Sequence, residues 1–168
     1  MMKKWLFCLV GVILSFPAAA DWYTGVQDDA FNEQKTATLF EIRSHPRFGI
    51  AFDCNSEGLS VSVVARTVKT DSITTELPID LIFRIDNYPA VKMTGAFVRR
   101  NENLYGYKSY DANSIKELLS YLRKANNRIL AGAKFSDEKR GISFDITPIG
   151  STSGVNKFIK ACNITIPQ

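Results

Sequence analysis

Two cysteines, Cys54 and Cys162, constrain the fold of this 168-residue chain more than any other pair of residues. A third, Cys8, lies in an N-terminal segment with the features of a leader peptide, so we expect two cysteines in the mature chain. An even number in an exported protein favours a disulfide, because that compartment is oxidising. The bond would close a loop of on the order of 100 residues and stabilise the fold by roughly 4–5 kcal/mol in the chain-entropy model. Two separate buried thiols are the alternative.

The export signal occupies residues 1–20. A basic head of two lysines precedes an apolar or small stretch at residues 5–16, and an Ala-x-Ala pattern ends at Ala20. These are the parts of a secretory signal peptide. The apolar run is too short for a membrane-spanning helix, which needs roughly 20 apolar residues. We therefore predict a single exported domain over residues 21–168, located in the bacterial periplasm (or secreted), with no transmembrane segment after cleavage.

The charge of the chain is nearly balanced. It has 21 Lys and Arg against 17 Asp and Glu, and two of the lysines leave with the leader, so the mature chain has a formal charge of +2. This balance does not require nucleic acid or an anionic membrane as a partner. No repeat or Pro/Gly-rich linker divides the chain, which is typical of one domain.

Alternation of apolar and polar residues predicts a β-rich domain. We expect an irregular lead-in at residues 21–35. Turn-forming residues at 55–58 and 136–140 predict two hairpins. The expected strands cover residues 36–44, 47–54, 59–68, 78–85, 90–99, 103–108, 128–135 and 141–147.

Two helices interrupt the β pattern. One is expected to begin with a capping box formed by Ser114 and Glu117, and the second covers residues 151–162, with apolar residues at helical spacing. The predicted fold class is α+β: mainly antiparallel and sandwich-like, with a mid-chain helix and a C-terminal helix held to the sheet by the disulfide. The predicted core comprises Phe48, Ile50, Phe52, Val61, Val63, Leu81, Phe83, Leu118, Leu122, Phe144, Phe158 and Ile159.

No catalytic motif stands out in the sequence. The single histidine, His45, has no second His or Cys cluster that would predict a metal site. Gly-x-Ser-x-Gly and phosphate-binding glycine patterns are absent. We therefore predict no catalytic residues, no metal and no cofactor. Paired carboxylates could still perform glycosidase chemistry from distant positions, and the candidates are Asp53, Asp80, Asp86 and Asp145.

A segment around one expected turn has the composition of a protein interface. Tyr and Arg are the residue types that most often anchor interfaces. The candidate interface consists of Arg99, Arg100, Tyr105, Tyr107 and Lys108. The alternative is that the two tyrosines pack on the sheet and keep only their hydroxyls in water.

The order of motifs resembles a known family. Phe-Asp-Cys ends one strand at Cys54, Arg-Ile-Asp ends another at Asp86, and Ser-Phe-Asp-Ile-Thr at residues 143–147 leads to a last helix closed by Ala-Cys at Cys162. Over roughly residues 36–163 the chain looks like the small periplasmic accessory proteins associated with type VI secretion. It is also similar to the invasion-associated locus B group of periplasmic proteins. The resemblance implies a non-enzymatic exported binding or assembly protein.

Three functions follow as hypotheses. The first is a non-enzymatic binding or accessory protein of the bacterial envelope, with a secretion-system role, whose partner is another envelope or secreted protein. The second is an exported inhibitor or exclusion factor that protects against an envelope-attacking enzyme or phage, because a rigid domain loses little entropy on binding. The third is an envelope hydrolase that uses distant carboxylates.

Signal cleavage should leave Asp21 as the first residue of the mature protein, because the small-residue pattern ends at Ala20. The intact mass of the protein from the periplasmic fraction checks this. A mass that retains residues 1–20 would contradict both the cleavage and the expected location.

Overall fold

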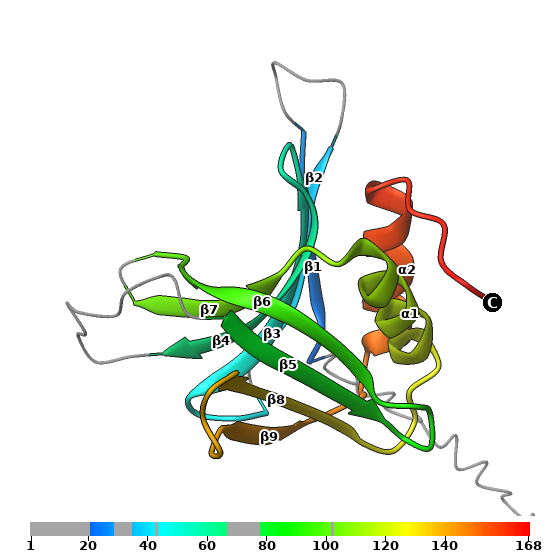
Figure 1. Cartoon of the computed structure of the whole chain (residues 1–168). Coiled ribbons are helices and arrows are strands. Elements are labelled where there is room, and N and C mark those ends of the chain that lie inside the picture. The colour runs from blue at the N-terminus through cyan, green and yellow to red at the C-terminus, as the bar shows by residue number, and fades with distance from the viewer. Residues whose placement is uncertain (1–20, 29–34, 43, 67–77, 102) are drawn as a thin grey trace, which may run out of the picture.

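The structure, a computed structural model, describes residues 21–28, 35–42, 44–66, 78–101 and 103–168 (Figure 1). The predicted signal peptide and the last two residues of the strand expected at 59–68 lie outside these ranges. The described strands are β1 Tyr23–Gln27, β2 Thr36–Glu41, β3 Phe48–Asn55, β4 Gly58–Arg66, β5 Pro78–Ile85, β6 Val91–Arg99, β7 Leu104–Ser109, β8 Ile129–Phe135 and β9 Ile142–Ile146. The described helices are α1 Ala112–Arg123 and α2 Ser151–Ala161.

All described strands belong to one antiparallel sheet with the order β1-β2-β3-β4-β7-β6-β5-β8-β9. Both helices lie on the same side of this sheet (Figure 1). Helix α2 packs on β1 and β2, and α1 packs on β4, β5 and β6 and against α2. The predicted class, a mainly antiparallel α+β fold with a mid-chain and a C-terminal helix, is confirmed.

The first strand corrects the expectation of an irregular lead-in at residues 21–35, of which residues 29–34 lie outside the described ranges. Strand β1 pairs with β2 and forms one edge of the sheet. Only Thr24 of this strand is buried, and its hydroxyl donates to the Gly154 carbonyl oxygen of α2 at 2.9 Å. The strand was missed because an edge strand exposes most of its side chains, so Tyr23, Val26 and Gln27 lack the apolar alternation of a central strand.

The core lies between the inner face of the sheet and the two helices. Of the predicted core residues, Phe48 and Ile159 are half-buried. The others are buried as predicted: Ile50, Phe52, Val61, Val63, Leu81, Phe83, Leu118, Leu122, Phe144 and Phe158.

The sheet bends at β6. This strand pairs with β5 from Val91 to Ala96 but with β7 only from Ala96 to Arg99, so it passes from one half of the sheet to the other. A Cβ atom at Gly95 would overlap the carbonyl oxygen of Lys108, and glycine is therefore needed where the two backbones approach.

The bend brings the two edges of the sheet together at one corner. Beside β1, the Trp22 indole N–H donates to the Thr147 carbonyl oxygen beyond β9 at 2.7 Å. The Phe144 ring of β9 stacks on Phe48 of β3, with ring centroids 5.3 Å apart. His45 packs against both phenylalanine rings, and its Nδ1 accepts from the backbone N–H of Phe48 at 3.3 Å. The single histidine thus has a structural role in this corner.

Helix α1 begins differently from the prediction. Asp111, rather than Ser114, is the N-cap, and its carboxylate accepts from the backbone N–H of Ser114 at 3.2 Å and from the Ser114 hydroxyl at 2.7 Å. The predicted capping box of Ser114 and Glu117 is wrong, since an acidic residue three positions earlier satisfies the free N–H group. Glu117 instead accepts from the Tyr121 hydroxyl at 2.6 Å.

The predicted disulfide is present. It joins Cys54, near the end of β3, to Cys162, the C-cap of α2, across 108 residues with a Cα–Cα distance of 6.2 Å. The bond therefore holds the last helix to the sheet. Neither of the two helices that the structure describes has the length and apolar character of a membrane span.

Removing the disulfide should strongly destabilise the fold. The double variant Cys54→Ser/Cys162→Ser should lose about 2–5 kcal/mol of the free energy of unfolding, because the unfolded chain regains the freedom of a long loop. Urea denaturation of the mature protein measures this. Wild type in reductant should match the double variant, and an oxidised wild type no more stable than the variant would contradict the prediction.

Candidate functional site

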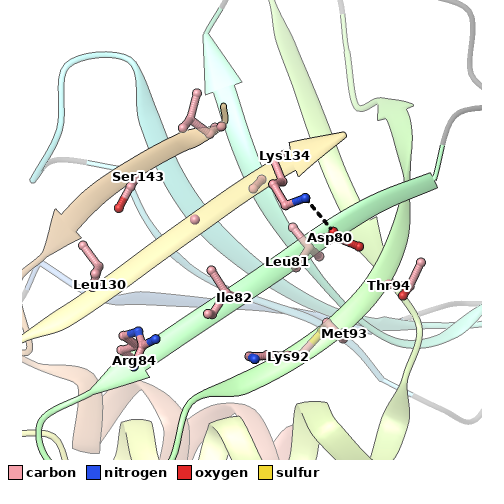
Figure 2. A pocket seen from close by; sticks show the side chains of 14 residues that line it. Asp80, Leu81, Ile82, Arg84, Lys92, Met93, Thr94, Leu130, Lys134 and Ser143 are labelled. Carbon is pink, nitrogen blue, oxygen red and sulfur yellow. Dashed lines mark ion pairs between the residues drawn. The ribbon is translucent and has the colours of Figure 1, made fainter. Parts of the chain in front are cut away.

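The candidate site is on the outer face of four strands, opposite the helices. In β5, the buried residues Ile79, Leu81, Phe83 and Ile85 direct the alternate residues Asp80, Ile82 and Arg84 to the outside. Figure 2 shows these side chains with those of β6, β8 and β9 on the same face of the sheet.

The strand register arranges the outer side chains in rows that cross the sheet. The first row contains Thr94, Asp80 and Lys134; the second Lys92, Ile82, Gly132 and Ser143; the third Arg84, Leu130 and Asp145. Directly paired residues on one face lie about 4.5–5.5 Å apart at their Cβ atoms. Residues from four strands therefore act on one small surface.

A groove of about 640 Å³ runs over these rows. The side chains of Ile82 and Leu130 supply apolar surface beside it (Figure 2). Gly132 lies between Ile82 and Ser143 and contributes no side chain; a Cβ there would lie 3.1 Å from Ile82 Cγ2. The Ile82 side chain therefore lies over the Gly132 backbone, and the second row carries no side chain of its own on β8.

At one end of the groove, a basic and an acidic side chain form an ion pair. Lys134 Nζ lies 3.1 Å from Asp80 Oδ2, and the Ser136 hydroxyl donates to Asp80 Oδ1 at 2.7 Å. The pKa of Asp80 is lowered, first by the Ser136 hydrogen bond and then by Lys134. Asp80 is therefore an ionised, paired carboxylate, a state that suits ion pairing rather than general-acid chemistry.

The other end carries positive charge without a matching carboxylate. Arg84 and Lys92 are both exposed and lie near one another in Figure 2. Neither forms an ion pair with a residue that the structure describes. The groove thus joins two available cations to an apolar surface, an arrangement that can bind an anionic group next to an apolar one.

The carboxylates considered for hydrolysis are all engaged with partners. Asp53 is paired with Arg100, and Asp145 Oδ1 accepts from Arg128 Nε at 2.5 Å. The pKa of Asp145 is lowered, chiefly by that Arg128 hydrogen bond. A glycosidase acid requires the opposite, a raised pKa. The geometry therefore gives these aspartates structural partners.

Asp86 has a different partner set, made of backbone. Its Oδ1 accepts from the N–H groups of Asn127 and Arg128 at 3.0 and 2.7 Å, and its Oδ2 accepts from Asn126 at 2.8 Å. These bonds lower the pKa of Asp86, with the Arg128 N–H as the largest cause. The carboxylate ties the turn after β5 to the segment that enters β8.

The candidate interface residues divide between the two faces of the sheet. Tyr105 is buried and Tyr107 half-buried on the inner face, where both rings contact Phe97, with centroids 5.4 and 5.6 Å away. Arg99 is exposed, and its Nε donates to the Asn101 carbonyl oxygen at 3.4 Å. Arg99 pairs with Tyr105 and lies on the same face as the tyrosines, which leaves Arg100 and Lys108 as the basic residues of the outer face.

Arg100 and Lys108 do come together on the outer face of the other half of the sheet. Arg100 binds Asp53 through two hydrogen bonds of 2.6 and 2.9 Å, and the Thr38 hydroxyl donates to the same carboxylate at 2.9 Å. Lys108 Nζ lies 3.5 Å from Glu57 and 4.6 Å from the centroid of the Tyr110 ring. Both cations are thus already occupied within the chain.

Sequence reasoning did not identify Arg84 and Lys92 as site residues. The alternation of apolar and polar residues in 78–85 predicts that Arg84 lies on the outer face of its strand. Its position beside Lys92 and Leu130 depends on the pairing of three strands and could not be read from spacing.

No three His, Cys, Asp or Glu side chains among the described residues form a group that could hold a metal ion. No family model matches the chain, and neither a curated protein nor a solved structure matches it.

Replacing Asp86 with Asn should destabilise the protein in a pH-dependent way. Asn tolerates the positive φ of 44° at this position but loses one acceptor oxygen and the charge. We expect a loss on the order of 1–2 kcal/mol at neutral pH. Because the folded pKa is lowered, the stabilisation is present above the unfolded value of about 3.9 and disappears as the pH falls through the folded value.

Thermal denaturation from pH 7 to pH 2 tests this expectation. The midpoints of wild type and Asp86→Asn should converge at acidic pH. Asp137→Asn, in the exposed turn between β8 and β9, is the matched control and should follow wild type throughout. A constant difference between wild type and Asp86→Asn over the whole range would show that the charge is irrelevant.

Proposed function

We propose that this chain is an exported binding protein of the bacterial envelope that holds a partner protein in the groove over β6, β5, β8 and β9. The observation that carries the proposal is the pairing of two available cations, Arg84 and Lys92, with the apolar side chains of Ile82 and Leu130. Specific recognition commonly uses an apolar surface with a few polar groups that set orientation.

Rigidity of the site supports binding as the function. The groove lies on strands whose inner residues, Leu81 and Phe83 among them, are buried in the main core. A preorganised surface loses little conformational entropy when a partner docks. Asp80 and Lys134 hold each other at one end, so the groove keeps a defined polarity from end to end.

The exported location is part of the proposal. Residues 1–20 have the pattern of a signal peptide, and the Cys54–Cys162 disulfide fits an oxidising compartment. The periplasm is the compartment that satisfies both. The resemblance to accessory proteins of type VI secretion suggests an assembly role there, with another envelope or secreted protein as the partner.

Binding accounts for the site better than hydrolysis. Asp80 is the acidic residue among the described residues that line the groove, and its lowered pKa favours the ionised form. A second role, as an inhibitor of an envelope-attacking enzyme, would use the same rigid groove and differs only in the identity of the partner. The chemistry of the groove is the same in both cases.

Blocking the groove should abolish capture of the partner. Ser143 is an exposed groove residue on β9, and a tryptophan there would place a large ring in the groove while suiting a strand. We expect wild type crosslinked in intact cells to yield a reproducible adduct that Ser143→Trp does not form. Denaturing gels and mass spectrometry of purified adducts measure the result.

The matched control is Ser153→Trp, at an exposed position of α2. It should form the same adduct as wild type. An adduct that persists in Ser143→Trp, with both variants folded to the same thermal midpoint, would overturn the groove as the binding site.

A further inference from the structure

We infer that the ligand of the groove is an acidic, extended segment of a partner protein in which Asp or Glu residues lie next to apolar ones. This inference rests on the proposed binding function and names the chemistry that the groove selects.

The two cations are neighbours without being partners of any described carboxylate. Lys92 pairs with Ile82, and Arg84 is two positions further along β5, so the two are diagonal neighbours on one face. Diagonal positions in an antiparallel pair lie about 7–8 Å apart. From positions this close, both exposed side chains can reach one anion, which would offset the repulsion between the two positive charges.

The two ends of the groove differ in charge pairing. At the Asp80 end, the facing residue on β8 is Lys134, and the two charges form an ion pair at 3.1 Å. At the other end, the facing residue of Arg84 on β8 is Leu130, which offers no charge. The groove is neutral at one end and positive at the other, so a complementary ligand is acidic at the positive end.

Each free cation faces an apolar side chain directly across the strand pair. Lys92 faces Ile82, and Arg84 faces Leu130. A carboxylate that reaches the cations therefore brings its neighbouring atoms over Ile82 and Leu130. Apolar atoms in that position would gain from burial and would also strengthen the ion pair by excluding water.

The size and the lining residues of the groove favour a peptide segment over other anionic partners. A volume of about 640 Å³ fits a short segment rather than a whole protein face. Recognition of anionic membranes uses clusters of roughly 4–8 basic residues, more than this groove presents. Single-stranded nucleic acid needs aromatic side chains for base stacking, and the described lining residues include none.

The test uses two fluorescein-labelled peptides with the mature protein. One alternates Asp with Leu, and the other is its isosteric Asn counterpart. Fluorescence anisotropy should show binding of the acidic peptide that is at least about tenfold tighter than that of the Asn peptide and that weakens as salt rises. Equal binding of the two peptides, or affinity unaffected by salt, would overturn the inference.

Charge reversal locates the interaction on the protein. Arg84→Glu/Lys92→Glu should weaken binding of the acidic peptide by at least about tenfold. Arg47→Glu/Lys116→Glu, which makes the same change in charge outside the groove, is the matched control and should retain wild-type affinity. If the groove double variant fails to fold, the single variants Arg84→Ala and Lys92→Ala replace it, each with a smaller loss. Equal affinity in groove and control variants would overturn the inference.

Two further ligands decide the class of partner. Vesicles of phosphatidylglycerol and a labelled thymidine oligonucleotide should bind more weakly than the acidic peptide at the same salt. Tighter binding of either would overturn the peptide assignment.

The inference and the proposed function fail in different ways. If Ser143→Trp blocks capture of the cellular partner but charge reversal at Arg84 and Lys92 does not, the groove is the binding site and the acidic ligand is wrong. If Ser143→Trp leaves capture intact, the proposed function itself is wrong.

Discussion

Burial of the inner face of the sheet beneath α1 and α2 is the constraint on which the remaining structure depends. Leu81 and Phe83 of β5 are each 1% exposed, and a slip of the strand by one residue would place Asp80 and Ile82 in their positions. The cost of burying a charge excludes that register. The same burial therefore determines which residues β5 presents on the outside, including Arg84.

Two links between segments that are distant in sequence hold this layered arrangement together. The disulfide holds α2 against the end of β3, while the Asp86 carboxylate holds the turn after β5 to the entry of β8. One link lies near each end of the layered core. The Asp86 carboxylate in particular joins the end of β5 to the start of β8, two of the strands whose outer faces line the groove.

The strands and core could be predicted from the sequence because their signals are local. Alternation in 47–54 and 78–85 and the helical spacing around Leu118 are each contained in about ten residues. Strand β1 lacked such a signal, since only Thr24 of its side chains is buried. The cap of α1 was assigned to the wrong residue because Ser114 and Asp111 both fit the capping rule locally, and only the geometry distinguishes them.

The groove could not be predicted because it depends on strand order. Ser143 is far from Ile82 and Lys92 in sequence and shares their row only because β8 lies between β5 and β9 in the sheet. The interface predicted at Arg99–Lys108 shows a related limit of the sequence pattern. The alternation predicts that Tyr105 and Tyr107 share one face of the sheet. It does not predict which of the two faces is buried.

The separation of Cys54 and Cys162 by 108 residues also means that the two cysteines are synthesised at different times. A chain is synthesised from its N-terminus, so Cys54 emerges long before its partner exists. Strands β3 to β9 and helix α1 are all complete before α2 brings Cys162 to the end of β3. The bond can therefore form only after every strand from β3 to β9 has been synthesised. Until Cys162 has been synthesised, the Cys54 thiol has no partner in this disulfide and can exchange only with other thiols and disulfides.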